Sequence, residues 1–148
     1  MNFDIRIKEE GGRIPLSSEE LKVIASRCFK ITGKKEGDIS LVVCDDGFIS
    51  SLNEKYLSEK SPTDVLAFPQ REGIKQPFDD RILGDIVISV ETAEKQASQM
   101  GKTLVEEFKI LFVHGLLHLL GYDHDTEDNK KQMDILAEKI LSGVMDSQ

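Results

Sequence analysis

The chain has 148 residues, a length that suits one domain with a substantial core and is short for two. Hydrophobic residues make up 39% and charged residues 31%, a balance typical of a globular protein rather than a disordered or fibrous one. Acidic residues outnumber basic ones 27 to 19, and the net charge of -8 argues against nonspecific attraction to nucleic acid. A local basic groove that binds nucleic acid is still compatible with this net charge. We therefore expect a single domain over residues 1–148.

Strand and helix patterns alternate over the first two thirds of the chain. Apolar residues at every second position of residues 2–8 predict a strand. Ser17 and Glu20 have the spacing of a capping box, which predicts a helix from there to Gly33. We further expect a strand at 38–46, a helix within 47–62 that stops before Pro62, and strands at 63–69 and 81–90 joined by a hairpin or lid that contains Gly73 and Pro77.

The last third of the chain has helical spacing throughout, with helices expected at 91–101, 103–121 and 126–143. Thr103 and Glu106 form a second capping box, and apolar residues are so frequent after them that helix 103–121 must be central and buried. Strands early and helices late predict an α/β (α+β) fold, in which helices pack on a small mixed sheet. The apolar stripe of 126–143 is expected in the core.

Cysteine usage and hydropathy indicate a cytoplasmic protein. Cys28 and Cys44 lie far apart in apolar surroundings, so we expect buried, reduced thiols. The amino-terminal residues are charged from Asp4 onward, and no apolar run approaches the roughly 18 residues that a membrane-spanning helix requires. We expect no membrane association.

All three histidines lie in the segment HGLLHLLGYDH, residues 114–124. His114 and His118 are four residues apart, so on a helix they share one face and can bind one ion. Gly121 can adopt a left-handed conformation that returns His124 to the same face. Zinc accepts three imidazole nitrogens and keeps a fourth position for water, which is the arrangement of a catalytic site. The spacing thus predicts one zinc ion per chain, bound by His114, His118 and His124.

Other interpretations of the histidines remain open. They can be core or surface residues, but two buried imidazoles would each need a hydrogen-bond partner. The spacing H-x3-H-x5-H is also that of metzincin proteases, in which a glutamate follows the first histidine as general base. Gly115 stands there and cannot take a proton, which disfavours peptide hydrolysis and leaves the general base unassigned.

The histidine segment, together with LNEKYL, SPTDVLAFP and LGDIVIS in the same order, closely resembles the YbeY family of bacterial metal-dependent endoribonucleases. The resemblance covers in effect the whole chain. It implies zinc at the three histidines, single-stranded RNA as substrate, and work on or near the ribosome, in 16S rRNA 3′ end maturation and ribosome quality control. An alternative is a ribosome-associated assembly factor whose zinc mainly holds the fold, and a less favoured one is a small metalloprotease. The sequence does not fix the oligomeric state.

The chain departs from the family pattern at Leu57 and Lys60, where the family usually has arginine and aspartate. Leucine cannot bind a phosphate as a guanidinium does, so another cation must do so if phosphate is bound. The candidate cations are Lys55, Lys60, Arg71 and Arg81.

Two further pairs of polar residues are expected to have local roles. Thr63 and Asp64 precede a short strand and are expected to hold a turn through bonds to the nearby backbone. Asp85 or Asp123 can orient a ligand imidazole through its free N–H group.

Overall fold

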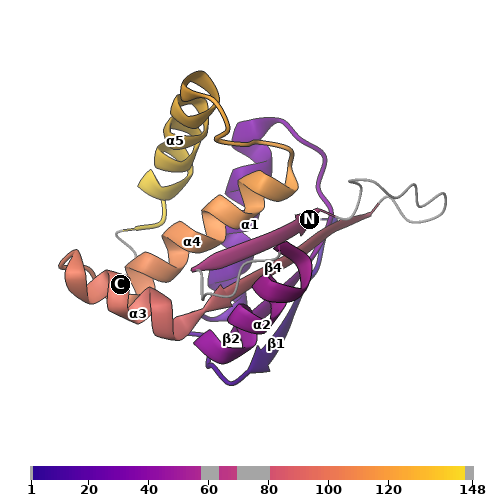
Figure 1. Cartoon of the computed structure of the whole chain (residues 1–148). Coiled ribbons are helices and arrows are strands. Elements are labelled where there is room, and N and C mark those ends of the chain that lie inside the picture. Colours follow the sequence, from indigo (N-terminus) through magenta and orange to yellow (C-terminus); the bar gives the residue numbers. More distant parts are fainter. Residues whose placement is uncertain (1, 58–63, 70–80, 146–148) are drawn as a thin grey trace.

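The computed structural model describes residues 2–57, 64–69 and 81–145. These residues form, in chain order, β1 (Ile5–Glu10), α1 (Ser18–Thr32), β2 (Asp38–Cys44), α2 (Asp46–Leu57), β3 (Val65–Pro69), β4 (Ile82–Ser89), α3 (Val90–Gln99), α4 (Leu104–Leu119) and α5 (Glu127–Ser142) (Figure 1). Each element matches the type predicted for its segment, with ends that differ by a few residues. None of these described helices has the length and apolar character needed to cross a membrane.

The strands form one mixed sheet in the order β1-β2-β4-β3. β1, β2 and β4 run parallel, and β3 pairs antiparallel with β4, so that Val65 lies opposite Ile88 and Pro69 opposite Gly84. This antiparallel pairing is that of a hairpin, one of the two alternatives expected from the sequence. Its connecting segment, with Gly73 and Pro77, lies outside the described residues.

Helices cover both faces of the sheet, because successive side chains of the inner strands point to opposite faces. Helices α1 and α4 pack on one face, α5 packs against both of them, and α2 lies on the other face (Figure 1). The larger core is on the α4 face and includes Leu41, Ile86 and Ile88. The smaller one, on the α2 face, is built from Cys44, Ile49, Leu66 and Val87. The fold is therefore the predicted α+β arrangement.

Both predicted capping boxes are present. Ser17 and Thr103 are the N-caps of α1 and α4, and each exchanges hydrogen bonds with the glutamate three residues later. Gly33 ends α1 in the left-handed conformation, with φ of 68°. These local signals fix where α1 and α4 begin and where α1 ends.

Both cysteines are buried and free, as predicted. Burial raises the pKa of the Cys28 thiol to about 12. Burial, with nearby carboxylates adding to it, raises the pKa of Cys44 to about 12 as well. Both side chains therefore remain protonated and act as small apolar residues.

Candidate metal centre

Helix α4 carries the histidines and is mostly buried, as the sequence predicted. Its close approach to the sheet depends on Gly115: a Cβ atom at this position would lie 2.8 Å from Cγ2 of Ile86 in β4. The residue that replaces the glutamate of zinc proteases is thus a packing requirement of this fold.

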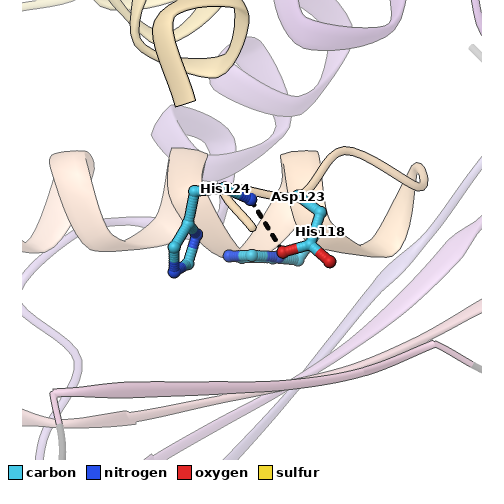
Figure 2. Close-up of side chains that lie close together, drawn as sticks. All are labelled: His118, Asp123 and His124. Atoms are coloured by element: carbon cyan, nitrogen blue, oxygen red, sulfur yellow. Dashed lines mark hydrogen bonds between the residues drawn. The ribbon is translucent and has the colours of Figure 1, made fainter. Parts of the chain in front are cut away.

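Three side chains converge where α4 ends (Figure 2). One potential ligand atom each from His118, Asp123 and His124 lies within 4.8 Å of the others. The two imidazole rings meet edge to face, with centroids 5.2 Å apart. Two nitrogens and one carboxylate oxygen form a donor set that zinc and other divalent transition metals accept. The residues present therefore fit a metal ion.

A tight turn brings these side chains together. The N–H of Gly121 donates to the carbonyl of His118, and the N–H of Tyr122 donates to that of Leu117, both at 3.0 Å. Gly121 has φ of 98°, so the predicted positive φ is confirmed, and a residue with a Cβ atom would be strained there. The helix itself ends slightly earlier, with Leu120 as its C-cap.

Asp123 holds the turn in place beyond the glycine. Its Oδ1 atom accepts a hydrogen bond of 2.7 Å from the backbone N–H of His124, which is the dashed line in Figure 2. This bond constrains the backbone at His124, from which its ring projects toward His118. Of the two carboxylates considered from sequence, Asp123 is the one that lies beside the histidines.

Asp85 is excluded from that role by the register of β4. Ile86 faces α4, so its neighbour Asp85 points to the opposite face of the sheet. There Asp85 lies opposite Ser40 of β2 and bonds to its side chain. The prediction that Asp85 can orient a ligand imidazole is wrong for this reason.

The environment of α4 favours neutral imidazoles. Partial burial lowers the pKa of His118, and His124 lowers it further, while Asp123 partly offsets both effects. Burial also lowers the pKa of His114. Only a neutral imidazole has a lone pair for a metal, so these shifts favour metal binding at neutral pH.

His114 lies one turn before His118 on the same face of α4, as its spacing predicted. It is not part of the group whose ligand atoms lie within 4.8 Å of one another. It is nevertheless close enough to His124 for that side chain to lower its pKa, an influence that Asp134 and Asp64 oppose. The structure thus brings two of the three predicted ligands together and leaves the role of the third a prediction.

A groove of about 520 Å³ opens beside this group. His118 and Asp123 form part of its lining, and Ala67, Pro69 and Leu83 form the wall made by the sheet. Lys34 and Lys35, from the connection between α1 and β2, line the groove together with Tyr122. The described lining residues are Lys34, Lys35, Ala67, Pro69, Leu83, His118, Leu119, Leu120, Gly121, Tyr122 and Asp123. The group of potential ligands is therefore accessible from a groove and is not enclosed in the core.

Of the cations proposed from sequence, the two that the structure describes, Lys55 and Arg81, do not line the groove. Lys55 is exposed on α2, on the opposite face of the sheet from α4, and Arg81 is not among the lining residues. Lys60 and Arg71 lie outside the described residues, as does the side chain of Leu57. Sequence reasoning missed Lys34 and Lys35, whose signal is a pair of lysines directly after the glycine that ends α1.

Asp64 has the local role that was predicted for it. Its Oδ1 atom accepts a bond of 2.8 Å from the N–H of Val65, and Oδ2 accepts one of 3.3 Å from the Gln96 side chain. The carboxylate thus fixes the start of β3. Thr63 lies outside the described residues.

Together these features define a small α+β protein with a candidate metal centre beside a groove. A family model described as Endoribonuclease YbeY matches residues 6–145. The chain is 46% identical over 131 residues to the endoribonuclease YbeY of Heliobacterium modesticaldum, covering 82% of this chain and 79% of that one. It is 42% identical over 137 residues to that of Moorella thermoacetica, covering 85% and 88%. The chain therefore belongs to the YbeY endoribonuclease family, as its sequence motifs indicated.

Two further comparisons extend this result. The chain is 45% identical over 101 residues to a chloroplastic endoribonuclease YBEY of Arabidopsis thaliana, covering 68% of this chain and 17% of that longer protein. A solution structure of a Thermotoga maritima protein superposes with a TM-score of 0.59 at 23% identity, covering 94% of this chain and 90% of the other. The second comparison supports the fold.

Proposed function

We propose that this chain is a zinc-dependent endoribonuclease that cuts single-stranded RNA. The observation that carries the proposal is the convergence of His118, Asp123 and His124 beside a groove, in a member of a family named for endoribonuclease activity. A divalent ion bound there supplies Lewis acidity toward water or a phosphate oxygen. An accessible position of this kind suits catalysis better than a purely structural ion, which is normally enclosed by four protein ligands.

The ligands we propose are His114, His118 and His124. His118 and His124 are already adjacent, and His114 shares the helix face of His118. Asp123 competes for the third place, but its Oδ1 atom already accepts the backbone N–H of His124. We therefore assign to Asp123 the orientation of the His124 ring rather than primary ligation.

The biological setting we propose is ribosomal RNA processing in the cytoplasm, at the 3′ end of 16S rRNA and in ribosome quality control. The support is the family membership, with the motif resemblance that runs along the chain. Peptide hydrolysis is disfavoured because Gly115 has no room for a side chain against Ile86 and carries no base.

Cleavage of labelled single-stranded RNA by zinc-restored protein tests the proposal. We expect cutting that a chelator stops, and its absence in His118→Ala purified in the same way. Lys131→Ala, an exposed change on α5, is the matched control and should cut normally. Intact RNA with wild type, combined with normal ribosome maturation in cells that carry His118→Ala, would instead support an assembly factor.

Metal affinity tests the ligand set. His118→Ala and His124→Ala should each weaken zinc binding by more than about 100-fold, since even loss of a residue that orients a ligand costs about 10- to 100-fold. His114→Ala should weaken zinc binding as much as these two variants do, whereas Asp123→Asn should weaken it by only about 10- to 100-fold. The reverse order for His114→Ala and Asp123→Asn would make the carboxylate the third ligand.

A further inference from the structure

The groove beside the candidate metal centre is lined by basic and aromatic side chains. Lys34 and Lys35 are exposed and line it, as does the half-buried Tyr122, which directly precedes Asp123 of the metal group in the chain. The Nζ atom of Lys34 is 5.4 Å from the centroid of the Tyr122 ring, close enough for a cation–π contact. Lys34 and Tyr122 are therefore in contact, although they are far apart in sequence, and Lys35 lines the same groove.

This pair of lysines stands out because the chain as a whole is acidic, with a net charge of -8. An overall negative charge repels RNA, so productive binding requires a local positive region at the site of approach. Among the described residues that line the groove, Asp123 is the acidic one, and it belongs to the metal group. The lysine end of the groove is therefore the part suited to an RNA backbone.

An aromatic ring beside cations has a specific use in RNA recognition. Proteins that bind single strands combine a positive groove that follows the phosphates with aromatic side chains on which bases stack. A base inside a duplex is already stacked on its neighbours and paired, so it is not free to lie on such a ring.

We propose that this groove binds one strand of the RNA substrate, with Lys34 and Lys35 on its phosphates and a base stacked on Tyr122 in the place that Lys34 occupies in this structure. The strand then runs from the lysines past Tyr122 to His118 and Asp123. The inference rests on the proposed function, and it names the residues that position the substrate and select a single strand. These are positioning residues, because none of them belongs to the metal group.

RNA affinity measured against salt tests the lysines. For single strands, the slope of log K against log salt is about -0.7 per neutralised phosphate, so Lys34→Ala with Lys35→Ala should reduce the slope by about 1.4 and weaken binding about 25-fold at about 0.1 M salt. The probe is a short fluorescent single-stranded RNA, with its integrity checked after each titration. Lys130→Ala with Lys131→Ala changes the net charge equally on exposed positions of α5 and should leave the slope unchanged.

Tyr122 is tested with two substitutions of similar bulk. Tyr122→Phe keeps the ring and should bind normally, whereas Tyr122→Leu should weaken binding about 5- to 150-fold, the range for one lost base stack. An RNA duplex of the same sequence should not distinguish the two variants. Circular dichroism and thermal melting confirm that the variants fold, and Lys34→Arg with Lys35→Arg, which keeps both charges, should bind RNA as the wild type does.

Cleavage kinetics separate this inference from the proposed function. In an active enzyme the lysine variants should raise KM with little change in kcat, whereas His118→Ala should remove activity. If wild type cuts RNA and the groove variants bind and cut as it does, the groove assignment is wrong and the function stands. If RNA binding depends on the groove but no RNA is cut, the function is wrong and the groove assignment stands. Equal loss in the Lys130 and Lys131 control would also overturn the inference, since the effect would then be one of net charge.

Discussion

Helix α4 is anchored at its amino end and accessible at its carboxyl end. At the amino end, Thr103 caps the helix, Phe108 is fully buried, and Nζ of the buried Lys109 donates to the carbonyl of Val144 at 2.8 Å. At the carboxyl end, His118 is half-buried and lines the groove. The contrast predicts that changes at the first end act on stability, and that changes at the second act on the metal and RNA binding that we propose.

The largest expected effect on stability is at the anchored end. Phe108→Ala removes a fully buried ring and should lower the free energy of unfolding by about 3–5 kcal/mol. Chemical denaturation of the metal-free protein measures this difference in the free energy of unfolding. Below its melting temperature the variant should still bind zinc, because its histidines are unchanged. Loss of zinc binding by a folded Phe108→Ala variant would contradict the separation of the two ends.

Gly115 lies between the two ends and gives a second, smaller effect. A Cβ atom there meets Ile86 at 2.8 Å, so Gly115→Ala should lower the free energy of unfolding by about 1–2 kcal/mol, the clash outweighing the higher helix propensity of alanine. In an Ile86→Ala background the clashing atoms are gone, and the same change should be neutral or stabilising. An equal loss in both backgrounds, measured as a double-mutant cycle, would show that this contact is not the cause.

A smaller effect still is expected from the cap of α4. Thr103→Ala removes the acceptor for the N–H of Glu106 and should cost about 1 kcal/mol. Thr103→Ser keeps the hydroxyl and serves as the control. Zinc affinity and RNA cleavage should stay at the wild-type level in both variants. A change in either would mean that the cap of α4 also affects the candidate metal centre.

The smallest expected effect at neutral pH is that of pH itself on the stability of the metal-free protein, and this effect grows as the pH falls. Burial lowers the pKa of His114 and His118 below the usual value of 6.5 in the folded chain. As pH falls through 6.5, the unfolded chain takes up protons that the folded chain does not, so the metal-free protein should lose stability, with no such loss above 6.5. Denaturation in chelator at several pH values checks this, and the double variant His114→Ala with His118→Ala should show a weaker dependence.

The sequence predicts local features of this molecule better than contacts between distant segments. Ser17 and Thr103 signal their helices through neighbours three residues away, and the adjacency of His118 and His124 follows from helix spacing and a glycine turn. The sequence alone did not indicate that Gly115 packs against Ile86, since that depends on the register of a remote strand.

The same reason explains the errors at the site. Asp85 was a candidate because its sequence neighbours form a recognisable motif, but the side of the sheet to which it points depends on strand register. Lys34 and Lys35 were missed because the fold brings them to Tyr122 from a connection far earlier in the chain. The sequence shows which side chains can carry chemistry, but it does not show which of them the fold brings together.

The groove and the histidine group also differ in how many separate segments of chain they require. The three histidines lie within residues 114–124, so closing that short loop costs little entropy. The groove wall needs the connection before β2, the end of β3, the start of β4 and the end of α4 to be in register. A molecule with a loosened sheet would therefore keep most of its ligand set while losing the groove. Metal content alone is then a poor measure of correctly folded protein, and a preparation is better judged by a property that depends on all four segments.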